Sequence, residues 1–460
     1  MIAVVGAGPA GLAAAWRAAV AGHDVVVLER SAQVGGMSAS FEVAGLRVDH
    51  GSHRLHPATP PPILDALRGL LGADLQTRPR HGRIRLLDRW LAFPLRTGDL
   101  LRRTPRRFAA RAAFDAATGP LRRPRSDTFA EVVRAGLGPA VLDAFYGPYA
   151  RKLWDTDPAD LAGELARRRV SASSPADIVR RLVRGARLEG RVFLYPRRGF
   201  GAIAEVLAEA AVAAGAEVRL GCGVTGLRRH ADRSGWTVAL DGGAVLDVDQ
   251  VWSTAPLPAL GGMTDPAPPA AATAAAARLR HRGLVLLYLV LDRPRWTEWD
   301  AHYFPGPEVL AARVSEPRNY RDDASQPADR TVLCAEIACW PGDDIWSASD
   351  AVLANRLAAE LTATGLPDPR WVGVESRRLP HVYPVYPPGY LDDLGTLERW
   401  AGDLGGLITF GRQGLFTPDN THHALAMGWA AADALGADGA LDAGRWRAAR
   451  DGFRSFVVED

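Results

Sequence analysis

Six consecutive residues near the start of the chain have types and spacing that can hold a pyrophosphate: Gly6-Ala7-Gly8-Pro9-Ala10-Gly11. In a strand-turn-helix unit the first glycine permits a tight turn, the second lets the backbone approach the phosphates, and the third lets the helix pack against the strand. Apolar residues 2–5 precede this run and an alanine-rich stretch follows it, so the free N–H groups of a helix N-terminus would face the ligand. We therefore predict a dinucleotide site formed by Gly6, Gly8, Pro9, Ala10 and Gly11.

A carboxylate follows the second apolar run, at the position where a dinucleotide site has an acid that binds the ribose. Glu29 follows a second apolar run, residues 25–28, and lies 18 residues after Gly11. A carboxylate at this position accepts hydrogen bonds from ribose hydroxyls and disfavours a 2′-phosphate, which predicts FAD or NAD rather than NADP. We expect the adjacent Arg30 at the same site. The alternative, a glycine-rich turn in an ordinary α/β domain, would not require the acid.

The composition is that of a globular protein: 47% of the 460 residues are hydrophobic and 23% are charged. The net charge of +3 does not indicate a nucleic-acid partner, and no run of about 18 apolar residues predicts a membrane span. Residues 1–22 lack the basic start of a secretory signal. The cysteines are odd in number and have no metal-ligand spacing, so we expect reduced thiols, no metal site and a cytoplasmic location: Cys222, Cys334 and Cys339.

The chain contains a single lysine, Lys152, among many arginines. Abundant Ala, Arg, Gly and Pro suggest a coding bias that replaces lysine wherever arginine serves equally well. A surviving lysine then indicates a place that needs a compact ammonium group, although survival by chance is the alternative.

A second glycine pair and a histidine-containing loop follow the dinucleotide motif. Gly35, Gly36 and Met37 precede the segment 48–57, which contains Asp49-His50-Gly51-Ser52-His53-Arg54-Leu55-His56. With the N-terminal fingerprint, these residues resemble the FAD superfamily of amine oxidases, protoporphyrinogen oxidases, phytoene desaturases and UDP-galactopyranose mutases. The resemblance implies that Gly35, Gly36, Met37 and His53 lie beside a flavin ring. For His53 and His56 a place in the core is the alternative.

The segment 146–158 resembles a substrate-domain motif of UDP-galactopyranose mutases and their relatives, and it contains the single lysine. In this interpretation the Lys152 ammonium would bind a carboxylate, a phosphate or a water, and the flat face of Trp154 would stack on a ring. We take His53, Lys152 and Trp154 as catalytic candidates, with Trp154 also in the substrate pocket. Buried packing is the alternative for Trp154.

The C-terminal part also resembles this superfamily. A strand at residues 407–410 leads into Gly411 and Arg412, and Asn420 and Thr421 can begin a helix that extends to Leu435. The resemblance implies that this helix directs its N-terminus at the flavin, where it would stabilise negative charge on the reduced ring. It also implies that the backbone near Val224 meets the adenine. The cofactor is thus expected to be FAD, with His423 as a further proton-handling candidate.

The resemblance implies an α/β fold: a discontinuous Rossmann-type FAD-binding domain with an inserted α+β substrate domain. We assign residues 1–80, 190–260 and 396–445 to the first, residues 81–189 and 261–395 to the second, and 446–460 to a C-terminal tail. Residues 60–190 are expected to be helical, and the arginine-rich stretch 96–125 is read as a solvated helix face, with contact to a membrane surface left open. Three side chains could line a substrate pocket or belong to the core: Arg313, Tyr383 and Tyr386.

These features predict an FAD-dependent oxidoreductase that takes a hydride from a small organic molecule. Two alternatives stay open: a redox-neutral enzyme like UDP-galactopyranose mutase, and a protein that holds FAD without catalysis. Two departures weaken the mutase reading. Of two arginines expected on a diphosphate, Arg168 matches and Ala172 does not; nearer the C-terminus, Pro418 and His422 replace an expected tyrosine and acid. The sequence indicates neither the substrate, the electron acceptor nor the oligomeric state.

Overall fold

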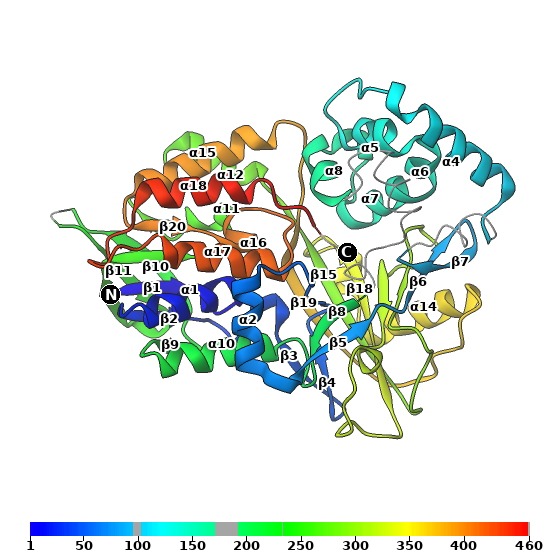
Figure 1. Ribbon diagram of the computed structural model, residues 1–460, viewed down its shortest axis with the longest axis horizontal. Coiled ribbons are helices and arrows are strands. Elements are labelled where there is room, and N and C mark those ends of the chain that lie inside the picture. The colour runs from blue at the N-terminus through cyan, green and yellow to red at the C-terminus, as the bar shows by residue number, and fades with distance from the viewer. Residues whose placement is uncertain (95–102, 171–191, 232, 459–460) are drawn as a thin grey trace.

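The computed structural model describes residues 1–94, 103–170, 192–231 and 233–458. The chain forms two lobes, with the N-terminus at the far end of the first and the last described residues between the two (Figure 1). The helical part of the second lobe, called the cap below, covers residues 103–169.

The first lobe is built on a parallel five-stranded sheet. In spatial order its strands are β20 (Leu407–Thr409), β13 (Gln250–Ser253), β1 (Ile2–Val5), β2 (Val25–Leu28) and β9 (Glu217–Arg219). β1 and β2 are buried along their whole length, as expected of apolar strands covered on both faces. Because these strands come from three separate stretches of chain, the lobe is discontinuous. The boundaries assigned from the sequence remain predictions.

Helices cover this sheet: α1 (Pro9–Val20), α10 (Ala202–Ala213) and α17 (Thr421–Asp433) (Figure 1). α1 and α17 pack closely because Gly428 has no side chain; a Cβ there would lie 2.2 Å from the carbonyl oxygen of Ala10. Residues 446–453 of the expected tail belong to α18 (Ala443–Phe453), and Trp446 and Phe453 pack into the core of this lobe.

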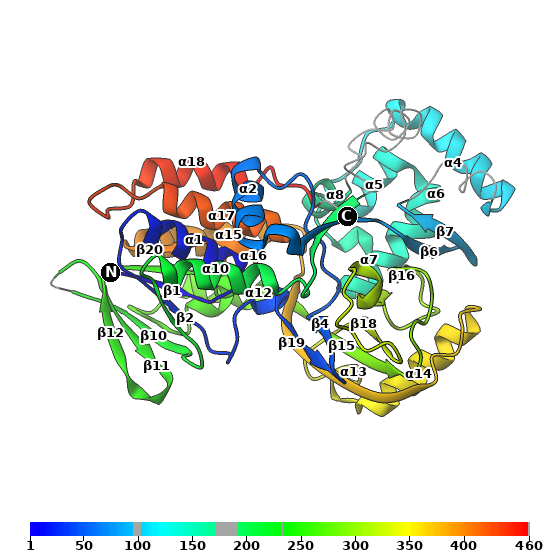
Figure 2. The ribbon, with the colours of Figure 1, turned by 60° about the horizontal axis from the view of Figure 1, so that its bottom comes forward.

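The second lobe contains a seven-stranded mixed sheet (Figure 2). Its order is β19 (Trp371–Pro384), β15 (His281–Leu291), β18 (Thr331–Cys339), β17 (Arg313–Ser315), β16 (Ala301–Tyr303), β6 (Gly82–Leu86) and β7 (Arg89–Phe93). Every residue of β15 and β18 is buried. α14 (Asp350–Ala363) covers one face through Leu353, Leu357 and Leu361.

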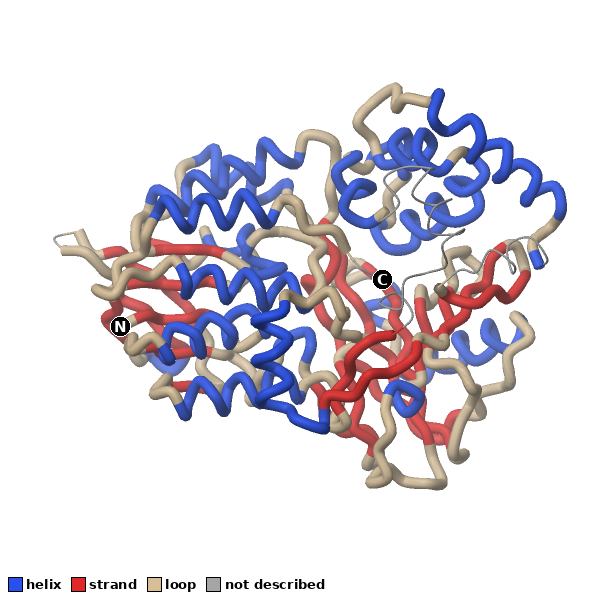
Figure 3. Tube along the Cα trace, in the orientation of Figure 1, coloured by secondary structure: helices blue, strands red, loops and turns tan. Residues whose placement is uncertain are grey.

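The cap consists of α4 (Arg106–Thr118), α5 (Phe129–Leu137), α6 (Pro139–Val141), α7 (Gly147–Trp154) and α8 (Gly163–Arg169), all seen as helices in Figure 3. The expectation that residues 60–190 are helical is therefore wrong in part. After α2 (Pro61–Leu71) the chain forms β5 (Leu75–Pro79), β6 and β7. β6 alternates buried and half-buried positions, which is the two-residue period of a strand, but arginines at the outward positions obscure it in the sequence.

The remaining strands form smaller sheets. One contains β12 (Val245–Val248), β11 (Trp236–Leu240), β10 (Val224–Arg229) and β14 (Thr264–Asp265); the others pair β3 (Ser40–Val43) with β4 (Leu46–Asp49), and β5 with β8 (Val192–Pro196). The other α-helices are α11 (Leu257–Leu260), α12 (Ala270–Arg278), α13 (Asp344–Ser347), α15 (Tyr390–Asp403) and α16 (Gly411–Gly414).

The three cysteines are free thiols. Within the described ranges no helix is both long and apolar enough to cross a bilayer, and no three metal-binding side chains gather at one point.

Candidate functional site

The turn between β1 and α1 leaves room for a ligand at Gly8. A Cβ on Gly8 would meet no protein atom within 4 Å, whereas one on Gly11 would lie 2.1 Å from the carbonyl oxygen of Gly6. Gly6 itself has φ +101°, in the left-handed region that favours glycine. The three glycines thus have the separate roles that the spacing predicts: turn, open approach and close packing. Pro9 begins the helix, and no side chain caps its N-terminus.

Glu29 joins this turn to the end of β2. Its side chain is 8% exposed, and its carboxylate accepts hydrogen bonds from Ala7 N at 2.8 Å and from Ser31 N and Oγ at 2.9 Å each. A carboxylate has about four acceptor positions, so capacity remains for a ribose hydroxyl. The backbone before Val224 adjoins this point: Cys222 N donates to Glu29 O at 2.8 Å, and a Cβ on Gly223 would lie 3.5 Å from Arg30 Cβ.

The Gly35–Met37 turn lies against the dinucleotide turn and connects it to two other segments. Gly35 N donates to Ala7 O at 2.8 Å, and a Cβ on Gly36 would lie 3.5 Å from Gly8 Cα. The carbonyl oxygen of Met37 accepts a hydrogen bond from His53 Nε2 at 2.9 Å. The sulfur of Met37 lies 3.6 Å from Gln413 Nε2. Segments that are hundreds of residues apart in the chain therefore meet at Met37.

The ring of His53 contacts Met37 and is engaged in hydrogen bonds, and its place beside a flavin remains a prediction. Nε2 lies within 3.0 Å of the carbonyl oxygens of Met37 and His50, so this nitrogen carries the proton and donates. The ring stacks on Phe200 with centroids 5.2 Å apart. His53 therefore fixes the position of the loop, and its role in proton transfer remains a prediction.

A buried ion pair holds the loop that contains His53. Glu336 accepts a hydrogen bond from Ser52 N at 2.7 Å, and its carboxylate pairs with Arg313 through Nη2 at 2.7 and 2.8 Å. Arg313 Nη2 also donates to Ser52 O at 3.0 Å. Burial lowers the pKa of Arg313, but Glu336, with smaller contributions from Tyr303, Tyr320 and Tyr383, more than compensates and keeps it well above its ordinary value. One charged pair, Arg313 and Glu336, thus binds both the backbone N–H and the backbone C=O of Ser52. We call this pair the Ser52 clamp.

Arg54 extends the same network toward the second lobe. Its guanidinium donates to the hydroxyl of Tyr303 at 2.8 Å and lies 3.1 Å from Asp300. Tyr320 contacts the network from the other side, through a hydrogen bond between its hydroxyl and Ser52 Oγ. No local pattern indicated four members of this network, because each lies more than 240 residues from the loop: Glu336, Tyr303, Tyr320 and Asp300.

The loop after β20 forms a third wall. Gly411 has φ +79°, and a Cβ there would lie 3.0 Å from Ala10 Cβ, so this loop rests on the start of α1. Arg412 donates to Asp419 O at 2.8 Å and Val382 O at 3.0 Å. Gln413 donates to His381 O at 2.8 Å. The pattern around Gly411 and Arg412 pointed to this loop, but not to Gln413.

Two buried polar atoms of this wall have no hydrogen-bond partner among the described residues: Arg412 Nε and Asp419 Oδ1. Unsatisfied buried polar atoms are costly and call for a ligand, an ion or water. Together with the open approach at Gly8 and the free N-terminus of α1, they fit a dinucleotide cofactor with a polar ring system. Gly6–Gly11, Glu29 and Gly35–Met37 would hold its phosphates and ribose, and loop 411–413 would meet the ring.

The expected C-terminal helix is present. Asn420 caps α17 by a capping box, in which the ring of His423 accepts a hydrogen bond from Asn420 N at 3.3 Å, and Thr421 is the first helical residue. Burial lowers the pKa of His423 to about 3, assisted by His422 and Arg168. Burial likewise lowers the pKa of His422 to about 4 and that of His281 to about 3. These imidazoles are therefore neutral at pH 7.

Lys152 and Trp154 have partners in the second lobe. The Lys152 ammonium donates to the carbonyl oxygens of Phe304 at 2.6 Å, Val309 at 2.7 Å and Ala311 at 3.4 Å. Burial lowers its pKa to about 8. Trp154 is 2% exposed and donates to Pro384 O at 3.1 Å. This geometry favours structural roles for both residues, and the catalytic roles inferred from the sequence remain predictions.

The substrate candidates separate into two groups. Tyr383 is half-buried, and burial raises its pKa. The charges of Glu336, Arg313 and Arg412 also act on this pKa, because Tyr383 lies between the Ser52 clamp and the third wall. Tyr386 is 2% exposed and donates to Phe416 O at 3.2 Å, which places it in the core. Arg313 belongs to the Ser52 clamp.

Arg168, the one matched diphosphate arginine, is occupied as well. Its Nε pairs with Glu164 at 3.1 Å and its Nη2 donates to Arg454 O at 3.3 Å. Val458 N donates to Arg168 O at 2.7 Å, so the end of the chain crosses α8 here. Ala172 lies outside the described residues.

Solved structures with similar folds include a reduced UDP-galactopyranose mutase, with 20% identity, 94% of this chain and 93% of that chain covered, and a TM-score of 0.76. A candidate protoporphyrinogen oxidase from Exiguobacterium sp. 255-15 has 19% identity, with 94% and 97% covered and a TM-score of 0.73. Digeranylgeranylglycerophospholipid reductase 1 of Methanopyrus kandleri is 52% identical over 58 residues, which are 11% of this chain and 16% of that protein. The chain thus spans under a fifth of this curated relative.

The family model described as flavin containing amine oxidoreductase matches residues 9–379, most of the chain and both lobes. The match begins at Pro9, the first residue of α1, and covers the Gly35–Met37 turn and the Ser52 clamp together. The chain belongs to the flavin-containing amine oxidoreductase family.

Proposed function

We infer that the cofactor is FAD and that the protein oxidises a small organic molecule by accepting a hydride from a C–H bond next to nitrogen, oxygen or a conjugated system. Glu29 supports a dinucleotide with free ribose hydroxyls, and the unpartnered Nε of Arg412 supports a polar ring beside Met37. When bound, FAD would supply the hydride-accepting chemistry.

The charge state of the site is the observation that carries this proposal. The histidines around loop 411–423 are neutral, and Arg168 and Arg313 are already paired with Glu164 and Glu336. The diphosphate of a nucleotide-sugar substrate carries two negative charges and, unlike a cofactor diphosphate bound at the N-terminus of α1, would depend on cationic side chains. A site whose candidate donors are occupied favours a substrate without a diphosphate, and so an oxidoreductase over a nucleotide-sugar mutase.

The protein's own residues have positioning roles in this proposal. The Ser52 clamp and His53 fix the loop beside Met37, and the N-terminus of α17, capped by Asn420, adds a positive dipole end where negative charge develops on reduction. Tyr383 contributes a half-buried hydroxyl between two walls and is the best-placed residue to contact the substrate. Hydride transfer needs no strong acid or base, which agrees with neutral imidazoles here.

Steady-state turnover tests this proposal. Purified protein is incubated with an artificial electron acceptor and a panel of donors: amines, a porphyrinogen, an isoprenoid polyene and reduced sugar derivatives. In parallel, dithionite-reduced protein is given UDP-galactopyranose, and ring-contracted product is sought. Consumption of the acceptor with one donor class supports the oxidoreductase. Ring contraction without acceptor consumption would identify the mutase activity instead.

A further inference from the structure

The arginine-rich segment concentrates positive charge on the cap. Between Arg103 and Arg125 the sequence has seven arginines and one acid, whereas the whole chain has a net charge of only +3. The acid, Asp115, is 3% exposed, and its carboxylate binds Arg122 at 2.8 Å and Ala140 N at 2.9 Å. It therefore offsets little of the charge that faces solvent.

The same segment has the two most exposed large hydrophobic side chains among the described residues. Leu121 is 86% exposed and Phe114 is 66% exposed. Large apolar side chains exposed next to concentrated arginine are the combination that helices lying on a membrane surface present.

α4 is fixed in an orientation that presents these side chains outward. Asp115 is its one fully buried residue, and it fastens the helix to the start of α6; a Cβ on Gly138 would lie 2.3 Å from Asp115 Cβ. Arg106 and Arg107 are exposed and form no ion pair within the described ranges. Arg111 approaches Asp143 only at 3.8 Å, and both are about 60% exposed.

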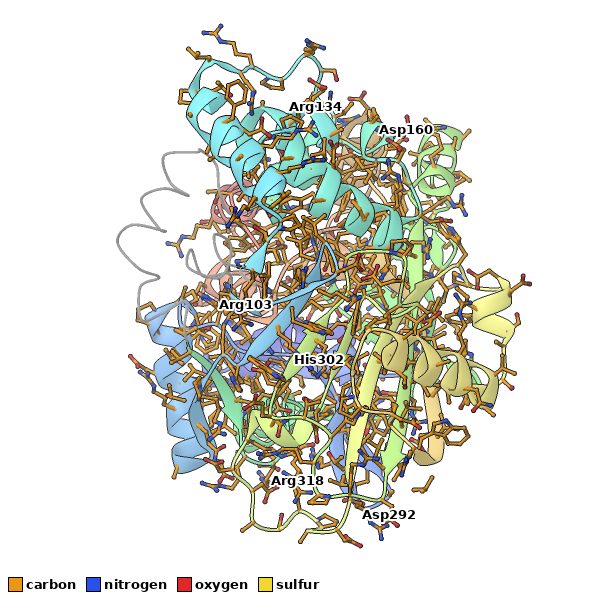
Figure 4. The ribbon with its side chains drawn as sticks, turned by 90° about the vertical axis from the view of Figure 1, so that its right-hand side faces the viewer. Arg103, Arg134, Asp160, Asp292, His302 and Arg318 are labelled. Atoms are coloured by element: carbon orange, nitrogen blue, oxygen red, sulfur yellow. The ribbon has the colours of Figure 1, made fainter. Side chains whose placement is uncertain are left out.

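The position of α4 makes this face accessible. α4 lies along the outer edge of the cap, on the side of the molecule opposite the first lobe (Figure 1). Figure 4 views this end of the molecule directly, with the cap at the top and Arg134 and Asp160 labelled on it.

We propose that Arg106, Arg107, Arg111 and Phe114 on α4, with Leu121 in the 3-10 turn Gly119–Leu121 that follows it, dock the protein on an anionic phospholipid bilayer; we call these five residues the α4 patch. The arginines match the negative surface of such a bilayer, and Phe114 and Leu121 match the boundary between head groups and acyl chains. A nucleic acid would satisfy the arginines but would leave Leu121 without an apolar contact. Docking through α4 would place the cap against the bilayer and the first lobe away from it.

Sedimentation of the full-length protein with lipid vesicles tests this proposal. We expect binding to phosphatidylglycerol vesicles to be at least about tenfold stronger than to phosphatidylcholine vesicles, and to weaken as NaCl is raised. The triple variant R106Q/R107Q/R111Q and the double variant F114S/L121S should each lose about tenfold in binding to anionic vesicles. Both variants keep Asp115, the residue that fastens α4 to α6. A thermal unfolding temperature equal to that of the wild type would verify that α4 stays folded in each variant.

Two controls separate the patch from overall charge and hydrophobicity. R68Q/R370Q/R445Q removes the same charge from arginines that are 58%, 80% and 69% exposed elsewhere. V352S/L391S removes two exposed apolar side chains from α14 and α15, 59% and 56% exposed. Both should bind like the wild type. Absence of vesicle binding, equal losses in the controls, or binding to single-stranded RNA but not to vesicles would overturn the proposal.

Discussion

Arg313 and Glu336 form a buried ion pair that holds both the N–H and the C=O of Ser52. The Arg313 guanidinium lies 2.7 Å from Glu336 and 3.0 Å from Ser52 O, and Glu336 lies 2.7 Å from Ser52 N. Ser52 precedes His53, which donates to Met37 beside the dinucleotide turn. A charged pair in the second lobe therefore positions a loop of the first.

Replacing Glu336 by glutamine should reduce both stability and cofactor retention. The substitution leaves the buried guanidinium of Arg313 without a counter-charge, and we expect the free energy of unfolding to fall by about 3 kcal/mol. Because Ser52 loses its anionic acceptor, the flavin absorption band should change shape and the cofactor should dissociate more readily. Chemical denaturation and equilibrium dialysis measure the two effects.

A double variant distinguishes positioning from stability. In R313M/E336L an apolar pair replaces the charged pair, which should restore much of the stability. The altered flavin band should persist, because neither backbone group of Ser52 keeps its charged partner. E398Q breaks the half-buried pair between Glu398 on α15 and Arg450 on α18 and should leave the band unchanged. An unaltered band in both clamp variants would show that the clamp serves stability alone.

Gly8→Val should remove the cofactor without unfolding the protein. The added side chain meets no protein atom, since the space at Gly8 is open, but it fills the approach to the pyrophosphate. The variant should be colourless, with thermal unfolding close to that of wild-type apoprotein. Gly402→Val in α15, which also has open space, should stay yellow. A yellow Gly8→Val protein would refute the dinucleotide site.

Lys152→Met should act mainly on stability. It leaves the carbonyl oxygens of Phe304 and Val309 without their donor, and we expect a loss of about 2 kcal/mol in the free energy of unfolding. The rate of flavin reduction per bound flavin should change little at temperatures where the variant is folded. If that rate instead falls about a hundredfold, which corresponds to about 3 kcal/mol of activation free energy, while the free energy of unfolding is unchanged, the ammonium takes part in the chemistry.

Acid should destabilise the protein through His423. Its pKa is about 3 when folded and about 6.5 when unfolded, so between these values the unfolded chain binds the additional proton. The contribution of neutral His423 to the free energy of unfolding is therefore complete above pH 6.5 and is lost as the pH falls toward 3. His423→Gln keeps a capping side chain and should reduce the slope of unfolding free energy against pH by about 1.4 kcal/mol per pH unit. Equal slopes in variant and wild type would contradict the assignment.

The parts of the site that depend on local pattern were predictable from the sequence. The dinucleotide turn, Glu29 and the start of α17 each follow from a few adjacent residues with a fixed geometry. The fold class followed from the resemblance, and the family match over residues 9–379 confirms it.

The parts that depend on distant partners were not predictable. Glu336 and Ser52 are 284 residues apart, and Lys152 meets carbonyl groups more than 150 residues away. Motifs identify which residue types recur, but the fold decides which atoms they contact. Lys152, Trp154 and Tyr386 are therefore engaged in packing that no local pattern specifies.

The most direct test of the account is the anaerobic absorption spectrum of the purified protein as candidate donors are added. We expect a visible flavin band from FAD bound at one per chain, and bleaching of that band by one class of hydride donor without dithionite. A band that no donor bleaches, but that UDP-galactose perturbs after reduction by dithionite, would contradict the oxidoreductase. A protein that stays colourless after incubation with FAD would contradict the flavin site itself.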